Sequence, residues 1–249
     1  MLHLVSLTAS SAMLAADPCG LPELPSGRKL QLQQTSWDDA GTGGVVWPAA
    51  RALCRWQAGV ADELAGARVL ELGAGTGACG LFAAGLGASH VSLTDGGPPG
   101  VVALAEANIE RNRPLFAAGA TASAERLLWG EGQPLPAEPL DFVLASDCTY
   151  HEQTRAPLCF TLRQLLLRDK PPRVILTQTR RDGPAAIEHF LEVASSFGLG
   201  AASTIEAQEP KDGNEGDESV GVTILELRVE GDAAEGAAES AVSDPRFVF

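Results

Sequence analysis

The chain has 249 residues, of which 45% are hydrophobic, enough for one large domain with a sizeable buried core. Its net charge of −14 disfavours non-specific binding to nucleic-acid phosphates, and residues 204–249 alone hold twelve of the acids and three of the bases. No apolar run approaches the roughly 20 residues that a membrane-spanning helix needs, so we expect no membrane partner. Five cysteines without CxxC spacing and four scattered histidines favour a reduced compartment and no metal site.

Residues 1–28 precede the first patterned segment and contain no Lys or Arg before Arg28. Targeting peptides normally carry basic residues, so we interpret 1–28 as an N-terminal extension. We expect a cytoplasmic or nuclear protein and leave organelle targeting open. Patterned segments run from Lys29 to Glu230, the expected extent of the domain. Residues 231–249 are acidic and poor in large apolar side chains, which predicts a disordered tail.

Short β-rich runs alternate with amphipathic helical runs through the middle of the chain. The strand-like runs lie at 67–75, 90–95, 140–147 and 172–179, and helical runs follow at 77–87, 100–112, 154–169 and 184–198. This alternation predicts a doubly wound α/β fold with a mostly parallel sheet. The run at 220–230 follows a loop rich in glycine and acids, which indicates a late antiparallel hairpin.

The turn after the first predicted strand, VLELGAGTGACG at 69–80, matches two nucleotide-binding templates. These are GxGxxG at Gly75, Gly77 and Gly80, and ExGxGxG at Glu71, Gly73, Gly75 and Gly77. The first favours a dinucleotide and the second S-adenosylmethionine (SAM), whose ammonium suits an acid where a pyrophosphate would be repelled. Asp95 lies 20 residues after Gly75, where either cofactor would present ribose hydroxyls. A purely structural tight turn is the third interpretation.

Further polar and aromatic residues follow predicted strands at the same sheet edge. Trp129 can form a wall of an adenine pocket or pack at the core edge. Asp147 and Tyr150, in SDCTY, can bind an amine and shape a channel, although Asp147 can instead cap the following helix. Upstream, Trp47 precedes Pro48, which suits the first turn of a helix, and can close over a cofactor or act as a buried anchor.

Taken together, GTGGVVWPAA, VLELGAGTGACGL, VSLTD, LLWGE and VLASDCTY resemble the seven-β-strand protein-lysine methyltransferases over about 31–228. The resemblance implies a seven-stranded class I methyltransferase sheet. It also implies that SAM contacts Trp47, Glu71, Gly73, Gly75, Gly77, Asp95, Trp129 and Ser146. Asp147 and Tyr150 fall on the family's D-x-x-Y element, where the acceptor lysine enters. Pro48, where an acid is common, and GGPPG after Asp95 depart from the pattern.

The expected reaction is in-line methyl transfer from SAM to a lysine amine of a protein substrate by a monomeric enzyme. A methyltransferase acting on a small molecule or on nucleic-acid amino groups is the first alternative. The second alternative is an NAD(P)-binding oxidoreductase or a non-catalytic binding module. The Tyr-x-x-x-Lys pair of short-chain dehydrogenases is absent at Tyr150, because Thr154 stands four residues on.

Overall fold

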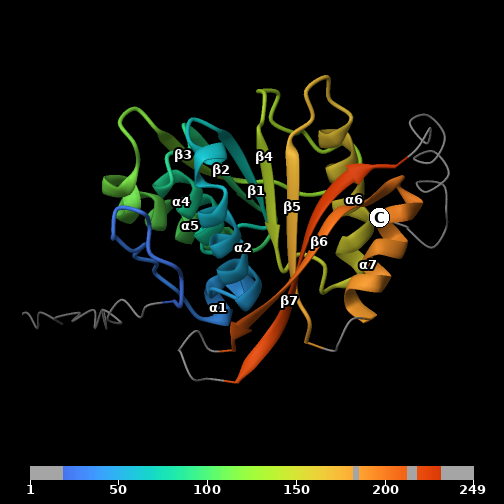
Figure 1. The fold of residues 1–249 in the computed structure, drawn as a ribbon, viewed down its shortest axis with the longest axis horizontal. Helices are drawn as coiled ribbons and strands as arrows, with labels where there is room; N and C mark the ends of the chain where they lie inside the picture. The colour runs from blue at the N-terminus through green and yellow to red at the C-terminus, as the bar shows by residue number, and fades with distance from the viewer. Residues whose placement is uncertain (1–18, 182–184, 212–217, 231–249) are drawn as a thin grey trace, which may run out of the picture.

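A single mixed sheet organises the chain (Figure 1). The structure, a computed structural model, describes residues 19–181, 185–211 and 218–230. The sheet has the strand order β3-β2-β1-β4-β5-β7-β6. Its strands are β1 (Arg68–Leu72), β2 (His90–Asp95), β3 (Thr121–Arg126), β4 (Phe142–Ser146), β5 (Arg173–Thr179), β6 (Leu199–Pro210) and β7 (Ser219–Val229). Strands β1 to β5 pair in parallel, whereas β7 pairs antiparallel with β5 and β6. The predicted parallel sheet with a late antiparallel hairpin is therefore confirmed.

Helices cover both faces of this sheet (Figure 1). On one side lie α2 (Pro48–Gly59), α4 (Ala78–Gly85) and α5 (Pro99–Asn112), and on the other lie α6 (Glu152–Leu166) and α7 (Ala185–Ser196). Short elements complete the described chain: α1 (Trp37–Ala40), η1 (Gly41–Gly44), α3 (Ala61–Leu64) and η2 (Arg113–Leu115). None of the helices in the described ranges is long and apolar enough to cross a membrane.

Strand β1 illustrates why the central strands are apolar on both faces. Val69 packs in the core beside α2 and α4, while Leu70 and Leu72 pack in the core beside α6 and α7. Successive side chains of a strand point to opposite faces, so a strand covered on both sides must be apolar throughout. Glu71 breaks this run on the α4 side, and it is 1% exposed. A buried acid is costly unless it is hydrogen-bonded, so Glu71 must have polar partners near the start of α4.

The strand order brings the predicted site residues to one edge. β1 has β2 on one side and β4 on the other. The chain runs from β1 outward through β2 and β3, and it then returns to the other side of β1 to form β4. Loops that follow parallel strands emerge at the carboxyl edge and diverge there, which opens a crevice. The glycine turn, Asp95, Ser146 and Arg181 all follow or end strands at this edge.

Both the late hairpin and the segment before Lys29 pack against the helices that cover the sheet. Arg55 of α2 donates to Glu209 of β6 at 2.7 Å, and Glu209 is 1% exposed, so the hairpin is tied to the helix that begins at the carboxyl edge. Leu24 is 3% exposed in the core that includes α4, so the packed chain begins before Lys29. The expected tail at 231–249 and residues 1–18 lie outside the described residues.

Candidate active site

A cavity of about 900 Å³ lies at the carboxyl edge of the sheet. Its walls come from the loops after β1, β2, β3, β4 and β5, and from the segment that contains α1, η1 and the start of α2. Nine of the ten predicted site residues line it: Trp47, Glu71, Gly73, Gly75, Asp95, Trp129, Ser146, Asp147 and Tyr150. The tenth, Gly77, does not. A Cβ on Gly77 would lie 2.6 Å from the Leu93 side chain, so the absence of a side chain at Gly77 allows α4 to pack closely on β2.

The glycine turn is compressed between two other segments. Gly75 has φ +53°, and a Cβ there would lie 2.9 Å from the carbonyl oxygen of Gly43. Gly73 has φ +65°, and its Cβ would lie 2.7 Å from the Cys148 Sγ and 3.2 Å from the Trp129 ring. Only glycine suits both the left-handed backbone and these contacts. The turn is therefore packed directly against η1, Trp129 and the loop after β4.

The side-chain carboxyl of Glu71, a residue of β1, lies at the start of α4. Its Oε2 accepts a hydrogen bond of 2.8 Å from the backbone N–H of Gly80, in the first turn of that helix. Burial raises the pKa of this carboxyl to about 7, although the Gly80 hydrogen bond opposes the rise. Free N–H groups at a helix start are what a bound pyrophosphate uses. Here an acid of the chain already takes one of them, which disfavours an anionic group in the same place.

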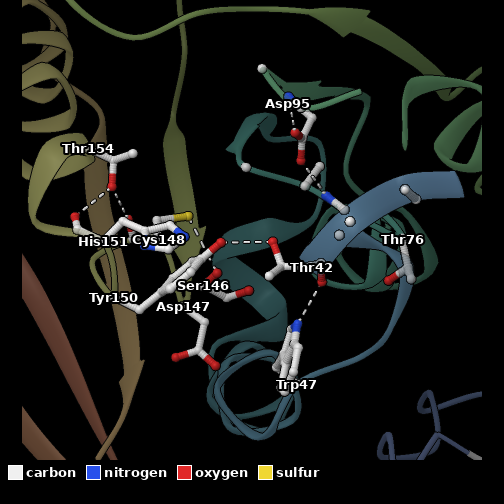
Figure 2. A pocket seen from close by; sticks show the side chains of 18 of the residues that line it. Thr42, Trp47, Thr76, Asp95, Ser146, Asp147, Cys148, Tyr150, His151 and Thr154 are labelled. Carbon is white, nitrogen blue, oxygen red and sulfur yellow. Dashed lines mark hydrogen bonds between the residues drawn. The ribbon is translucent and has the colours of Figure 1, made fainter. Parts of the chain in front are cut away.

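Asp95 ends β2 and braces two turns. Its Oδ2 accepts from the Gly75 N–H at 2.9 Å, and its Oδ1 accepts from the Gly97 N–H at 2.8 Å (Figure 2). Each carboxylate oxygen has a second lone pair, so both can also accept hydrogen bonds from the hydroxyls of a diol. The carboxylate is thus held in a fixed orientation at the cavity wall.

Trp129 and Cys148 line the cavity beside the core that includes α6. Trp129 lies three residues beyond the end of β3, and its buried indole Nε1 has no hydrogen-bond partner. Cys148 contacts the Leu72 carbonyl oxygen at 3.3 Å, and burial, with a smaller contribution from Asp95, raises the pKa of its thiol well above the usual range. Cys148 therefore stays a neutral thiol. The sequence offered only its place inside SDCTY as a signal for this wall residue.

Asp147 is the only non-glycine residue with positive φ, +52°, in the described parts of the chain. Its Oδ1 accepts from the backbone N–H of Thr179 at 2.8 Å, and its Oδ2 accepts from the Thr179 hydroxyl at 2.7 Å and from Arg181 at 2.9 Å. Its carboxylate points away from Asp95 (Figure 2). It does not cap a helix, because α6 begins at Glu152 and its N-cap, His151, makes no side-chain cap bond.

Tyr150 and Trp47 are joined through Thr42, which the sequence analysis did not single out. The Tyr150 hydroxyl and Thr42 Oγ1 are 2.8 Å apart, and the Trp47 indole donates to the Thr42 carbonyl oxygen at 2.8 Å (Figure 2). The Arg181 guanidinium lies 4.9 Å from the centre of the Trp47 ring. These contacts link η1, α2 and the loops after β4 and β5 around one end of the cavity. Thr42 and Tyr150 are 108 residues apart in the sequence, so their contact leaves no local signal.

Metal ligation and disulfides find no support in the described residues. No group of three or more His, Cys, Asp or Glu side chains is placed there to hold a metal ion. None of the five cysteines, all of which lie within the described ranges, forms a disulfide. The chemistry of the cavity is thus set by Glu71, Asp95, Asp147 and Arg181 together with aromatic and glycine surfaces.

Comparison with known proteins gives a consistent assignment. The fold is similar to that of PH1948 from Pyrococcus horikoshii, which has been assigned to the RNA methyltransferases, with a TM-score of 0.51 over 74% of this chain and 84% of that chain at 15% identity. At that identity the likeness concerns the fold alone.

Sequence relatives include the protein N-lysine methyltransferase METTL21A of Danio rerio, 38% identical over 141 residues, or 56% of this chain and 62% of the relative. The calmodulin-lysine N-methyltransferase of Arabidopsis thaliana is 32% identical over 155 residues, 61% of this chain and 50% of the relative. The mouse EEF1A lysine methyltransferase 3 is 34% identical over 139 residues, which are 56% of this chain and 57% of the relative. The aligned part thus spans half to about three fifths of these relatives. The lysine methyltransferase family matches residues 25–197, more than half of the chain, and the chain belongs to this family.

Proposed function

We propose that this protein transfers the methyl group of SAM to the side-chain amine of a lysine in a protein substrate. The observation that carries the proposal is the pair of fixed carboxylates in one cavity, Glu71 at the start of α4 and Asp95 at the end of β2. An acid near an ammonium and an acid near a diol match the two polar ends of SAM.

The residues present fit SAM better than a dinucleotide. A cavity of about 900 Å³ falls in the range of sites that enclose a molecule of this size. Three carboxylates and one guanidinium line it, a balance that favours a cationic ligand over a pyrophosphate. The Gly80 N–H at the helix start is also taken by Glu71. Trp129, with its unpartnered indole N–H, offers a flat face for an adenine ring.

The chain's own residues divide the cavity into two ends along the sheet edge. Asp95 and Trp129, after β2 and β3, would hold the adenosine, and Glu71 and the glycine turn after β1 would hold the amino-acid part. Bound SAM supplies an electrophilic methyl group on a sulfonium. Asp147 and Tyr150, after β4, together with Trp47, then form the acceptor end.

The acceptor end must deliver an amine with a free lone pair. An unperturbed lysine has a pKa of about 10.4, so only about one in two thousand is neutral at pH 7. The aromatic rings of Trp47 and Tyr150 favour the neutral form, because apolar surroundings lower the pKa of an amine. The lysine ammonium first loses one proton to water. The neutral amine nitrogen then forms the new N–C bond as the C–S bond breaks, and the product leaves as a methylammonium with SAH. Asp147 aims the acceptor rather than removing its proton, because its oxygens already accept from Thr179 and Arg181.

A protein substrate is favoured by the family and by the relatives, whose names specify protein-lysine methylation. Nucleic acid is a poor alternative for a chain with a net charge of −14. A small-molecule amine remains the competing acceptor.

The test has a binding arm and a product arm. Calorimetry should give micromolar affinity for SAM and for S-adenosylhomocysteine (SAH), at least tenfold weaker binding in Asp95→Ala, and none for NADH. Incubation with methyl-labelled SAM and a cell lysate should then place label on lysine in protein, as identified by mass spectrometry after proteolysis, with Asp95→Ala as the control. NADH binding without SAM binding would reject the cofactor. Label confined to nuclease-sensitive or low-mass material would reject the acceptor.

A further inference from the structure

Arg181 is the one Lys or Arg among the cavity-lining residues of the described chain. It follows β5, and its guanidinium donates to Asp147 Oδ2 at 2.9 Å while lying over the Trp47 ring at 4.9 Å. The Arg181 side chain is 39% exposed, whereas that of Asp147 is 3% exposed. A buried carboxylate is therefore paired with a cation that still faces the cavity.

Hydrogen bonds from Thr179 fix the orientation of the Asp147 carboxylate that pairs with Arg181. Thr179 donates to both carboxylate oxygens from its N–H and its hydroxyl, and Arg181 supplies the charged partner of Asp147 among the described residues. The backbone of Asp147 is held at φ +52° in doing so. An aspartate tolerates this conformation at a cost that surrounding contacts must offset, and such strain gathers at functional sites.

The charges at the two ends of the cavity differ. Glu71 and Asp95 belong to the end over β1 and β2, where they are fixed by the N–H groups of Gly80 and of Gly75 and Gly97. At the end over β4 and β5, the titratable or charged lining groups are Asp147, Cys148, Tyr150, His151 and Arg181. Burial keeps the Cys148 thiol neutral by raising its pKa, and the ion pair between Asp147 and Arg181 is the charged contact at this end.

We propose that Arg181 is a positioning residue that cancels the charge of Asp147 at the acceptor end, so that this end accepts a neutral amine beside a sulfonium. The inference rests on the proposed function. Without Arg181, the carboxylate would attract the ammonium form of the acceptor, which has no lone pair to donate. With Arg181 in place, Asp147 can orient the acceptor without stabilising its proton.

The first test needs no protein substrate. SAM is a cation at sulfur and SAH is neutral there, so the ratio of their dissociation constants reports the charge felt at the reacting centre. Calorimetry on Arg181→Met should shift this ratio about tenfold toward SAM, because Asp147 is no longer compensated. Arg181→Lys, the matched control, keeps the charge and should keep the ratio. Asp147→Asn should shift the ratio the other way, and the double variant Arg181→Met with Asp147→Asn should restore it.

The second test uses methyl transfer to a substrate peptide. The pH profile of Arg181→Met should move upward by about one pH unit, because the acceptor amine holds its proton more tightly, while Arg181→Lys should follow the wild type. Thermal denaturation of each variant controls for folding, and Asp147→Asn carries the ratio test if Arg181→Met does not fold.

Equal ratios in all variants that bind both ligands would overturn the inference and leave the proposed function standing. A shift of the same size in Arg181→Lys and Arg181→Met would also overturn it, because shape rather than charge would then be responsible. If the wild type binds neither ligand, the proposed function fails and the inference fails with it.

Discussion

Replacing Gly75 with alanine separates backbone strain from the contact that the glycine turn makes with η1. Gly75 has φ +53°, and its Cβ would lie 2.9 Å from the Gly43 carbonyl oxygen and 3.2 Å from the Gly43 Cα. Gly66, with φ +77°, is the matched control, because a Cβ there meets nothing within 4 Å. A left-handed conformation costs an alanine about 1–2 kcal/mol, which applies to both variants. Displacing packed backbone adds about 1–3 kcal/mol to Gly75→Ala alone.

Urea denaturation gives the free energy of unfolding of both variants, and calorimetry gives their affinity for SAM. Gly75→Ala should be less stable than Gly66→Ala by at least about 1 kcal/mol. It should also bind SAM at least tenfold more weakly, because the clash pushes η1 away from the cavity and shifts the N–H that holds Asp95. Gly66→Ala should bind SAM like the wild type, since Gly66 does not line the cavity.

Equal stability and equal SAM affinity in the two alanine variants would refute this reasoning. That result would mean that η1 yields without cost and that its contact with the turn does not shape the cavity. A loss of stability in Gly75→Ala with full SAM affinity would refute the functional half alone.

The remaining predictions concern the acids of the cavity and the contact across it. Because burial raises the pKa of Glu71 from its ordinary value of 4.5 to about 7, the folded protein keeps a proton on this carboxyl at a pH where the unfolded chain has released it. The free energy of unfolding should therefore fall by up to about 3 kcal/mol from this group as pH rises from about 4.5 to 7. Glu71→Gln should flatten that fall in urea titrations, and an unchanged slope would contradict the assignment. Asp147→Ala should be less stable than Asp147→Asn by at least about 1 kcal/mol in the same assay, because asparagine tolerates φ +52°; equal stability would argue against strain. Thr42→Val removes the hydroxyl bonded to Tyr150 and should speed SAM dissociation two- to tenfold in stopped-flow fluorescence, with little loss of stability at this exposed contact; an unchanged rate would show that the contact does not close the cavity.

Local patterns predicted the elements and the edge at which the site forms. The apolar run that ends in Glu71, the run that ends in Asp95 and the run that leads to Ser146 each predicted a strand, and parallel strands bring their carboxyl ends together. Gly73 and Gly75 were predictable for the same reason, because a tight turn after a strand needs positive φ. These inferences need only the period of the side chains and the handedness of the connections.

The partners of the site residues depended on the tertiary structure. The sequence predicted Asp147 as a site acid and left helix capping as the alternative. In the structure its carboxylate does not cap α6 and instead bonds to Arg181, 34 residues away. Thr42 and Tyr150 meet across 108 residues. Gly77, which fits the glycine motif as well as Gly75 does, turned out to face Leu93 instead of the cavity.

The position of β7 between β5 and β6 was likewise decided by packing. Its long apolar run, including Val222, Leu225 and Leu227, is buried beside β5, while β6 leaves Ile205 46% exposed at the sheet edge. A sequence specifies how each element can bury its apolar face, because periodicity is local. Which surfaces then meet, and which charges they pair, depends on distances between segments that lie far apart along the chain and become neighbours only when the sheet is assembled.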